Sequence, residues 1–176
     1  MNQLTNLPEP WLRGTLTETP AVLRAVVHAF QAAEEDLQRW CGSLTQEEVH
    51  QRPAGLASVA FHLRHIPGSV DRLLTYAEGR ELSPEQMAVL KTEGESSATT
   101  RELLQHLSAE LHAAARRVQR FSPADLEQRR SVGRKQLPTT VGGLLVHVAD
   151  HTQRHVGQAI TTAKLLIAQR GDGKPA

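Results

Sequence analysis

The sequence has a single cysteine, few aromatic residues and almost no excess of charge. Because Cys41 is the only cysteine among 176 residues, an internal disulfide is impossible and we expect a reducing compartment, the cytoplasm. Aromatic residues make up 3% of the chain, so aliphatic side chains must fill the core, which favours packed helices over sheets. A net charge of +1 argues against binding to nucleic acid or to an anionic membrane.

Long apolar runs are also missing. None approaches the roughly 18 residues that a membrane-spanning helix needs. The first 25 residues carry acidic side chains and prolines instead of a basic start and an apolar stretch, so we expect no signal peptide. The length suits one domain, and residues 1–176 are predicted to form a single soluble domain with an irregular arm at 1–18 and a polar tail at 171–176.

Apolar residues recur at helical spacing in four long segments, which is the strongest structural signal in the chain. A capping box at Thr45 and Glu48 predicts a short connecting helix before Pro53, and Ser83 with Pro84 predicts another. The sequence therefore predicts an all-α four-helix bundle with short connecting helices. The long helices are expected over residues 20–40, 58–79, 99–121 and 140–170, with Thr19 as the cap of the first.

Two segments of the chain depart from the regular helical pattern. Pro67 lies inside the second long segment, where it removes a backbone donor, so we expect a kink just after His65. Residues 129–138 contain four basic residues together with Gly133 and Pro138, and they are predicted to form a solvated loop.

Histidine is unusually common in this sequence, and five of the nine histidines fall into two groups. His62 and His65 lie on the second long segment, while His147, His151 and His155 lie on the fourth at i, i+4 and i+8. Neighbours in the second group are one helical turn apart, a spacing that lets two imidazoles bind one ion. The outer two are roughly 12 Å apart along the axis, at about 1.5 Å per residue, so all three cannot bind the same ion.

The position of each histidine relative to the apolar stripe ranks the candidates for a metal site. The stripe of the fourth segment includes His155, has His151 at its edge and leaves His147 outside, on the rim. We therefore predict that His151 and His155 bind one divalent metal ion together with a histidine from a facing helix. Periodicity favours His62 over His65 as this third ligand, but the expected kink weakens that argument, so both remain candidates.

Two motifs make the sequence similar to a known family. SVAFHLRHI at residues 58–66 and HTQRHVGQ at residues 151–158 resemble the DinB-like (DinB/YfiT) superfamily of damage-inducible, metal-binding four-helix-bundle proteins, and the resemblance covers most of the chain. In that family the first motif supplies one histidine ligand and the H-x-x-x-H-x-G-Q element supplies two. The resemblance thus implies the ligand set His65, His151 and His155, although the arginine common after the last histidine is Val156 here.

The predicted site suggests a metal-dependent enzyme. Three imidazoles leave one coordination position open, as in catalytic sites, and zinc and nickel both suit imidazole ligands. The resemblance implies a homodimer and a chemistry that joins a low-molecular-weight thiol to a small electrophile. We therefore predict a metal-dependent thiol S-transferase or a related detoxifying enzyme.

Two other functions stay open on the sequence alone. The first is a metal-dependent hydrolase, for which Asp150 is the nearest carboxylate in sequence, although helical periodicity points it away from His151. The second is a non-catalytic, stress-associated dimer that uses a metal with a closed coordination shell to tie two helices together.

Three further features of the sequence can be explained without a role in catalysis. Cys41 is expected to be a packing residue. Arg72 and Tyr76 are four residues apart and either reach a substrate or belong to a solvated helix face. Gly157 destabilises a helix, which suggests that another backbone packs closely against that turn.

Overall fold

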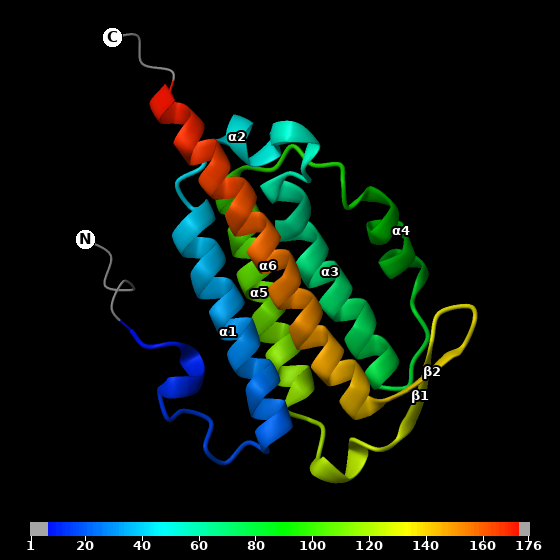
Figure 1. The fold of residues 1–176 in the computed structure, drawn as a ribbon. Coiled ribbons are helices and arrows are strands. Elements are labelled where there is room, and N and C mark those ends of the chain that lie inside the picture. The colour runs from blue at the N-terminus through cyan, green and yellow to red at the C-terminus, as the bar shows by residue number, and fades with distance from the viewer. Residues whose placement is uncertain (1–6, 173–176) are drawn as a thin grey trace.

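Four long helices dominate the fold in the computed structural model, which describes residues 7–172 (Figure 1). Both α1 and α3 pack against α5 and α6, so the four helices form a closed bundle. The prediction of an all-α four-helix bundle with short connecting helices is confirmed. The long helices are α1 (Ala21–Cys41), α3 (Val59–Ala77), α5 (Thr100–Val118) and α6 (Val141–Asp172).

Short helical elements join the long helices. α4 lies on the outer side of α3, and α2 with η3 covers the end of the bundle where α3 begins (Figure 1). The predicted arm at residues 1–18 contains η2, and residues 1–6 of this arm lie outside the described residues. The short elements are η2 (Pro10–Leu12), α2 (Gln46–His50), η3 (Pro53–Gly55), α4 (Pro84–Thr92) and η4 (Pro123–Asp125).

Hydroxyl side chains fix where most of the helices begin. Their oxygens accept hydrogen bonds from backbone N–H groups in the first turn, which satisfies donors that have no partner within the helix. Three of these residues form complete capping boxes, at the starts of α2, α4 and α5. The capping residues are Thr45, Ser58, Ser83, Thr99 and Thr140.

Some predicted helix ends were wrong by a few residues. α1 is preceded by Pro20 rather than capped by Thr19, because Pro20 has extended backbone angles and stays outside the first turn. α6 continues to Asp172, so only residues 173–176 remain of the predicted tail, and they lie outside the described residues. None of these shifts moves a histidine out of its helix.

The prediction of a solvated loop at residues 129–138 was wrong. This segment and its neighbours form an antiparallel hairpin of β1 (Arg129–Val132) and β2 (Leu137–Thr140). The Arg130 guanidinium joins the hairpin to the end of α3, since its Nε donates to the Ala77 carbonyl at 2.8 Å. The strands carry few apolar side chains, so no hydrophobic alternation reveals them in the sequence.

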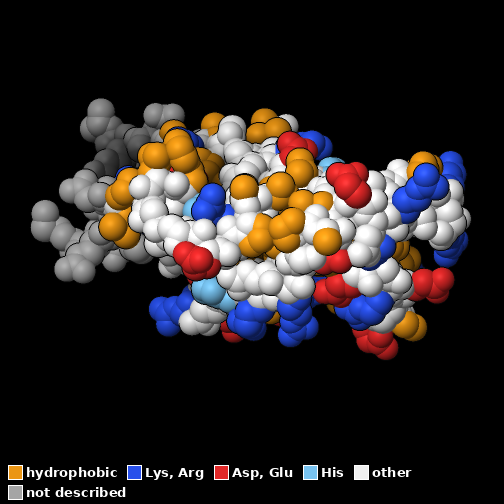
Figure 2. Space-filling view, turned by 90° about the horizontal axis from the view of Figure 1, so that it is seen from below, with side chains coloured by type: hydrophobic (Ala, Val, Ile, Leu, Met, Phe, Trp, Pro, Cys, Tyr) orange, Lys and Arg blue, Asp and Glu red, His pale blue; other side chains and the backbone are white. Residues whose placement is uncertain are grey.

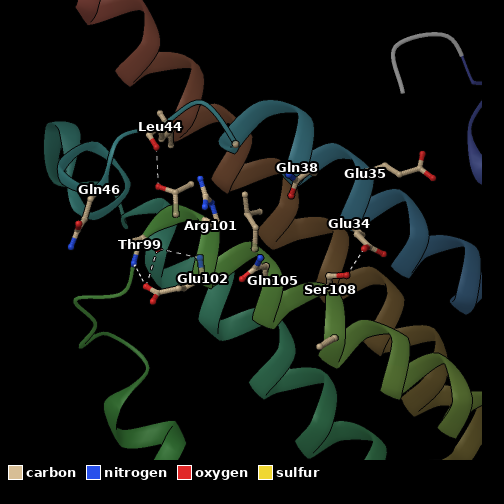
Figure 3. A pocket seen from close by; sticks show the side chains of 14 residues that line it. Glu34, Glu35, Gln38, Leu44, Gln46, Thr99, Arg101, Glu102, Gln105 and Ser108 are labelled. Carbon is tan, nitrogen blue, oxygen red and sulfur yellow. Dashed lines mark hydrogen bonds between the residues drawn. The ribbon is translucent and has the colours of Figure 1, made fainter. Parts of the chain in front are cut away.

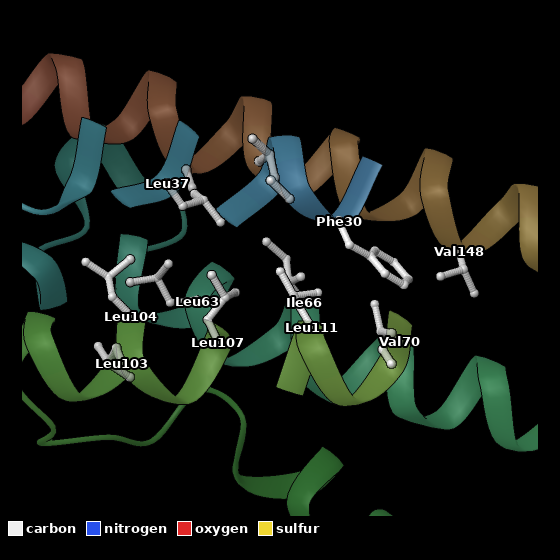
Figure 4. Close-up of a cluster of buried hydrophobic side chains, with 14 of the residues drawn as sticks. Phe30, Leu37, Leu63, Ile66, Val70, Leu103, Leu104, Leu107, Leu111 and Val148 are labelled. Atoms are coloured by element: carbon white, nitrogen blue, oxygen red, sulfur yellow. The ribbon is translucent and has the colours of Figure 1, made fainter. Parts of the chain in front are cut away.

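Aliphatic side chains from all four long helices meet in one continuous core (Figure 4). Phe30 from α1 is the largest fully buried side chain, and most of the others are leucine, valine and isoleucine. Burying each such side chain stabilises the fold by about 1.5–3 kcal/mol before conformational entropy is counted. This core holds α3 and α6 side by side. The labelled members are Phe30, Leu37, Leu63, Ile66, Val70, Leu103, Leu104, Leu107, Leu111 and Val148.

The surface agrees with the near-neutral composition. On the face shown in Figure 2, acidic and basic side chains are interspersed around a central group of hydrophobic ones. That face therefore presents no extended surface of one charge. Among the described residues, no helix combines the length and the apolar character needed to cross a bilayer.

Candidate metal centre

Three histidines from two helices converge where α3 lies against α6. His65 comes from α3, whereas His151 and His155 come from α6. One ring nitrogen of each lies within 4.8 Å of the others, and all three residues are half-buried. The Nε2 of His65 lies 3.1 Å from the Nε2 of His151. The structure therefore brings together the three residues that the resemblance implied as ligands.

The start of α3 positions His65. Ser58 Oγ accepts a hydrogen bond from the Phe61 backbone N–H at 3.1 Å, which sets the phase of the first turn. The Phe61 ring then stacks on the His65 ring, with centroids 5.2 Å apart and planes 16° from parallel. α3 continues without a break through Pro67, which is buried. His65 is thus held by helix geometry and by packing against a neighbouring ring.

The buried stripe of α6 positions the other two histidines. Val148, Thr152 and Val156 face the core and are buried. His151 and His155 each precede one of these residues, so both lie at the edge of the stripe, half-buried. The stripe also contains Thr152, a buried polar residue that the apolar pattern of the sequence omits.

A buried carboxylate completes the surroundings of His65. Glu93, just after α4, is 4% exposed, and its Oε2 accepts a hydrogen bond from His65 Nδ1 at 2.7 Å. Its Oε1 accepts from the Arg72 guanidinium at 2.6 Å. Arg72 is itself buried, so its interpretation as part of a solvated face was wrong. Sequence reasoning missed Glu93 entirely, because it lies in an irregular segment with no motif around it.

His62, the alternative ligand from periodicity, lies beside the cluster. It is 3% exposed, and its Nδ1 is 3.0 Å from the Nδ1 of His155. A hydrogen bond between two such nitrogens requires one of them to donate and the other to accept. Periodicity correctly placed His62 towards the interior, but the nitrogens that converge with those of His151 and His155 belong to His65.

His147 stands apart from the three converging histidines, as the helical stripe predicted. It is exposed, and its ring centroid is 5.5 Å from that of His151. Among the described residues, it is not part of the group whose nitrogens converge.

Burial makes the rings of His62, His151 and His155 hard to protonate. Burial is the main reason that the pKa of His155 falls to about 4, and neighbouring imidazoles, first His65, add to the effect. Burial likewise lowers the pKa of His62 to about 4 and also lowers the pKa of His151. At neutral pH these rings are uncharged, which is the state in which imidazole binds metals.

The donor set fits a transition-metal ion of the zinc type. In tetrahedral geometry with Zn–N bonds of about 2.0–2.1 Å, two ligand nitrogens are about 3.3 Å apart, close to the 3.1 Å between His65 and His151. Because His65 Nδ1 donates to a carboxylate, the lone pair of the neutral ring is on Nε2, the atom nearest His151. The residues present therefore suit imidazole coordination of zinc or nickel.

Two cavities lie at different distances from this cluster. The larger, about 1100 Å³, is lined by α1 and α5 and contains none of the clustered histidines (Figure 3). Polar side chains such as Glu34 and Ser108, which bond to each other at 2.5 Å, line it. The smaller, about 490 Å³, is lined by His62 and by residues of α6 that include Arg154, Gly157 and Gln158. None of the three converging histidines lines this second cavity, but His62, which does, contacts His155.

Other residues considered from the sequence lie outside the cluster. Burial raises the pKa of the Cys41 thiol to about 12, which fits its predicted packing role. Asp150 is exposed and pairs with Arg154 at 2.5 Å. The prediction of close packing at Gly157 is wrong within this chain, since no described atom beyond its own turn of α6 lies within 4 Å of the position its Cβ would take. Gly157 borders the 490 Å³ cavity instead.

The comparisons with known proteins bear on the fold and on the family. Residues 29–159, a range that includes all three converging histidines, match the DinB superfamily. A crystal structure of a conserved protein from Enterococcus faecalis has a similar fold, with a TM-score of 0.61 and 21% sequence identity. The match covers 84% of this chain and 98% of that chain, and at this identity it concerns the fold alone. No curated protein matches the chain.

Proposed function

The chain belongs to the DinB superfamily, and from that premise we propose that it is a metal-dependent enzyme that transfers a small thiol to an electrophile. His65, His151 and His155 are the proposed ligands of one zinc or nickel ion. The observation that carries this proposal is the convergence of three imidazole nitrogens within 4.8 Å from two helices. When bound, the ion would act as a Lewis acid that favours the deprotonated form of a thiol.

The neighbours of His65 and His155 support this assignment because they bear on where each of these two rings carries its proton. His65 holds a proton on Nδ1, where it bonds to Glu93, and this leaves the Nε2 lone pair free. If His155 donates from Nδ1 to Nδ1 of His62, its Nε2 is free in the same way. His62 then carries its own proton on Nε2 and stays neutral.

The number of ligands favours an enzyme over a structural metal site. A closed tetrahedral shell needs a fourth protein ligand, for which His62 and His147 are the candidates. The Nδ1 of His62 is engaged with His155, and His147 is exposed and outside the converging group. Three ligands leave a position open to a substrate, and the 490 Å³ cavity beside His62 provides space next to the cluster.

Hydrolysis is less well supported because the nearby carboxylates are already engaged. Asp150 pairs with Arg154 at the surface, and both oxygens of Glu93 accept hydrogen bonds. Neither is placed to act as a general base.

In the proposed transfer, the S–H bond breaks and its proton goes to solvent, an S–C bond forms, and the leaving group of the electrophile departs with its bonding electron pair.

A conjugation assay tests the proposed reaction. Zinc- or nickel-loaded protein would be incubated with cysteine, glutathione or coenzyme A and with a fluorogenic chlorinated electrophile such as monochlorobimane. We expect at least one thiol to be conjugated faster than without protein, and the His155→Ala variant to lose that increase. Equal rates for wild type, variant and buffer with every thiol would reject the transferase, whatever the metal content.

A further inference from the structure

Glu93 occupies a position in which a carboxylate is costly. It follows α4 directly, in a turn whose neighbours Thr92 and Gly94 are exposed, yet its own side chain is almost fully buried. A buried carboxylate is tolerated only when it is paired and hydrogen-bonded. Both of its oxygens are satisfied, one by His65 and the other by Arg72.

Gly68 keeps the space that this carboxylate needs. A Cβ at this position would lie 2.6 Å from Glu93 Oε1 and 3.1 Å from a guanidinium nitrogen of Arg72. Glycine inside a helix costs about 1 kcal/mol relative to alanine, and here the close approach explains its presence. α3 therefore offers three groups to Glu93 at successive turns: the imidazole of His65, the gap at Gly68 and the cation of Arg72.

The backbone around Glu93 is also attached to α3. Arg64, next to His65, donates from its guanidinium to the carbonyl of Thr92 at 2.8 Å and to the carbonyl of Glu95. The turn is thus bound to α3 on both sides of Glu93. This arrangement fixes the carboxylate relative to the His65 ring, in addition to joining α4 to the bundle.

We propose that Glu93 is a positioning residue for metal binding, which it serves by holding the His65 ring with its Nε2 towards His151. Arg72 orients the carboxylate, and Gly68 admits it. The inference rests on the proposed metal centre, to which it adds a residue from a third segment of the chain. If Glu93 only joined α4 to α3, its replacement would lower the stability of the fold without changing how the metal is bound.

The test compares metal binding with stability in matched variants. Glu93→Gln keeps the size of the side chain but removes its charge, and Glu95→Gln removes an exposed carboxylate from the same turn as a control. Zinc affinity would be measured by competition with a chromophoric chelator, and the visible spectrum of the cobalt-substituted protein would report the ligand geometry. The melting temperature of the metal-free protein would separate folding from binding.

We expect Glu93→Gln to weaken zinc binding about 10- to 100-fold and to change the cobalt spectrum, with Glu95→Gln like wild type. Gly68→Ala should weaken binding in the same direction, because its methyl group displaces the carboxylate. If Glu93→Gln does not fold, Arg72→Lys would be used instead. It perturbs the ion pair between Arg72 and Glu93 from the other side, and it should weaken zinc binding in the same direction.

Two results would overturn the inference, and they can be told apart. Unchanged affinity and spectrum in Glu93→Gln, with only a lower melting temperature, would reduce Glu93 to a structural role and leave the metal centre intact. Binding of neither zinc nor nickel by the wild type would remove the metal centre itself, and the role of Glu93 with it.

Discussion

The Nε2 atoms of His65 and His151 lie 3.1 Å apart, although the two residues are separated by 86 positions in the sequence. The packing of α3 against α6 brings them together, and His155, one turn further along α6, joins them. Two imidazole nitrogens at this distance are close enough to bind one ion in tetrahedral geometry.

His62 is predicted to support the metal without binding it. Its removal in His62→Ala takes away the hydrogen-bond partner of His155 but leaves the three converging nitrogens in place. We expect one metal ion per chain at saturation, with an affinity about 10-fold or more below that of wild type. The measurement is metal stoichiometry and affinity for His62→Ala beside His65→Ala. Loss of stoichiometry in the first variant and its retention in the second would make His62 the ligand instead.

Metal removal should destabilise the folded protein. A ligand that binds only the native state stabilises it by about 4 kcal/mol when its free concentration is 1,000 times its dissociation constant. We therefore expect the melting temperature to fall by several degrees after chelation and to recover when zinc or nickel is added back. The His65→Ala variant serves as the control and should show no recovery. Equal responses of wild type and variant would indicate that the metal acts elsewhere.

The stability of the metal-free protein should fall in mild acid. His62 and His155 have a pKa of about 4 in the folded state because they are buried, against an ordinary value of 6.5. Between these values the unfolded chain binds protons that the folded protein does not, so the free energy of unfolding decreases as the pH falls from 6.5 towards 4. Each such group contributes a slope of at most about 1.4 kcal/mol per pH unit.

Urea unfolding of the metal-free protein between pH 7.5 and 5 measures this decrease. His62→Gln should lower the slope, while His106→Gln, which removes an exposed histidine, controls for the loss of a ring. A free energy of unfolding that stays constant over this range would show that the buried rings gain protons as readily as exposed ones.

Cys41 should be inert in the native protein. It is 0% exposed, and burial raises the pKa of its thiol to about 12, so almost no thiolate is present at pH 8. A chromogenic disulfide reagent is expected to react with it only slowly in buffer and completely within minutes in denaturant. Fast stoichiometric labelling of the folded protein would contradict the burial of this residue.

The four long helices could be predicted because local signals agree with the tertiary structure. Apolar residues recur at helical spacing, and residues such as Ser58 and Thr99 cap the helices in the structure as their positions suggested. The hairpin could not be predicted in this way. Its register depends on pairing between strands and on the contact of Arg130 with the end of α3, neither of which leaves a hydrophobic pattern.

The site was only partly predictable for a similar reason. The spacing of His151 and His155 on one helix is a local signal, whereas the choice between His62 and His65 depends on how α3 is rotated against α6. Glu93 comes from a separate irregular segment, and only tertiary packing places it against His65. The sequence feature most closely related to Glu93 is Gly68, a glycine inside a helix. Its presence is explained by the carboxylate that lies beside it in the structure.

Elemental analysis of protein purified without a histidine tag tests the central claim most directly. Wild type would be compared with the triple variant His65→Ala, His151→Ala, His155→Ala, and His106→Ala would serve as a control for the loss of an exposed histidine. We predict about one zinc or nickel ion per chain in wild type and control, and none in the triple variant. Equal metal in the triple variant, or no metal in wild type even after reconstitution, would contradict the proposed site.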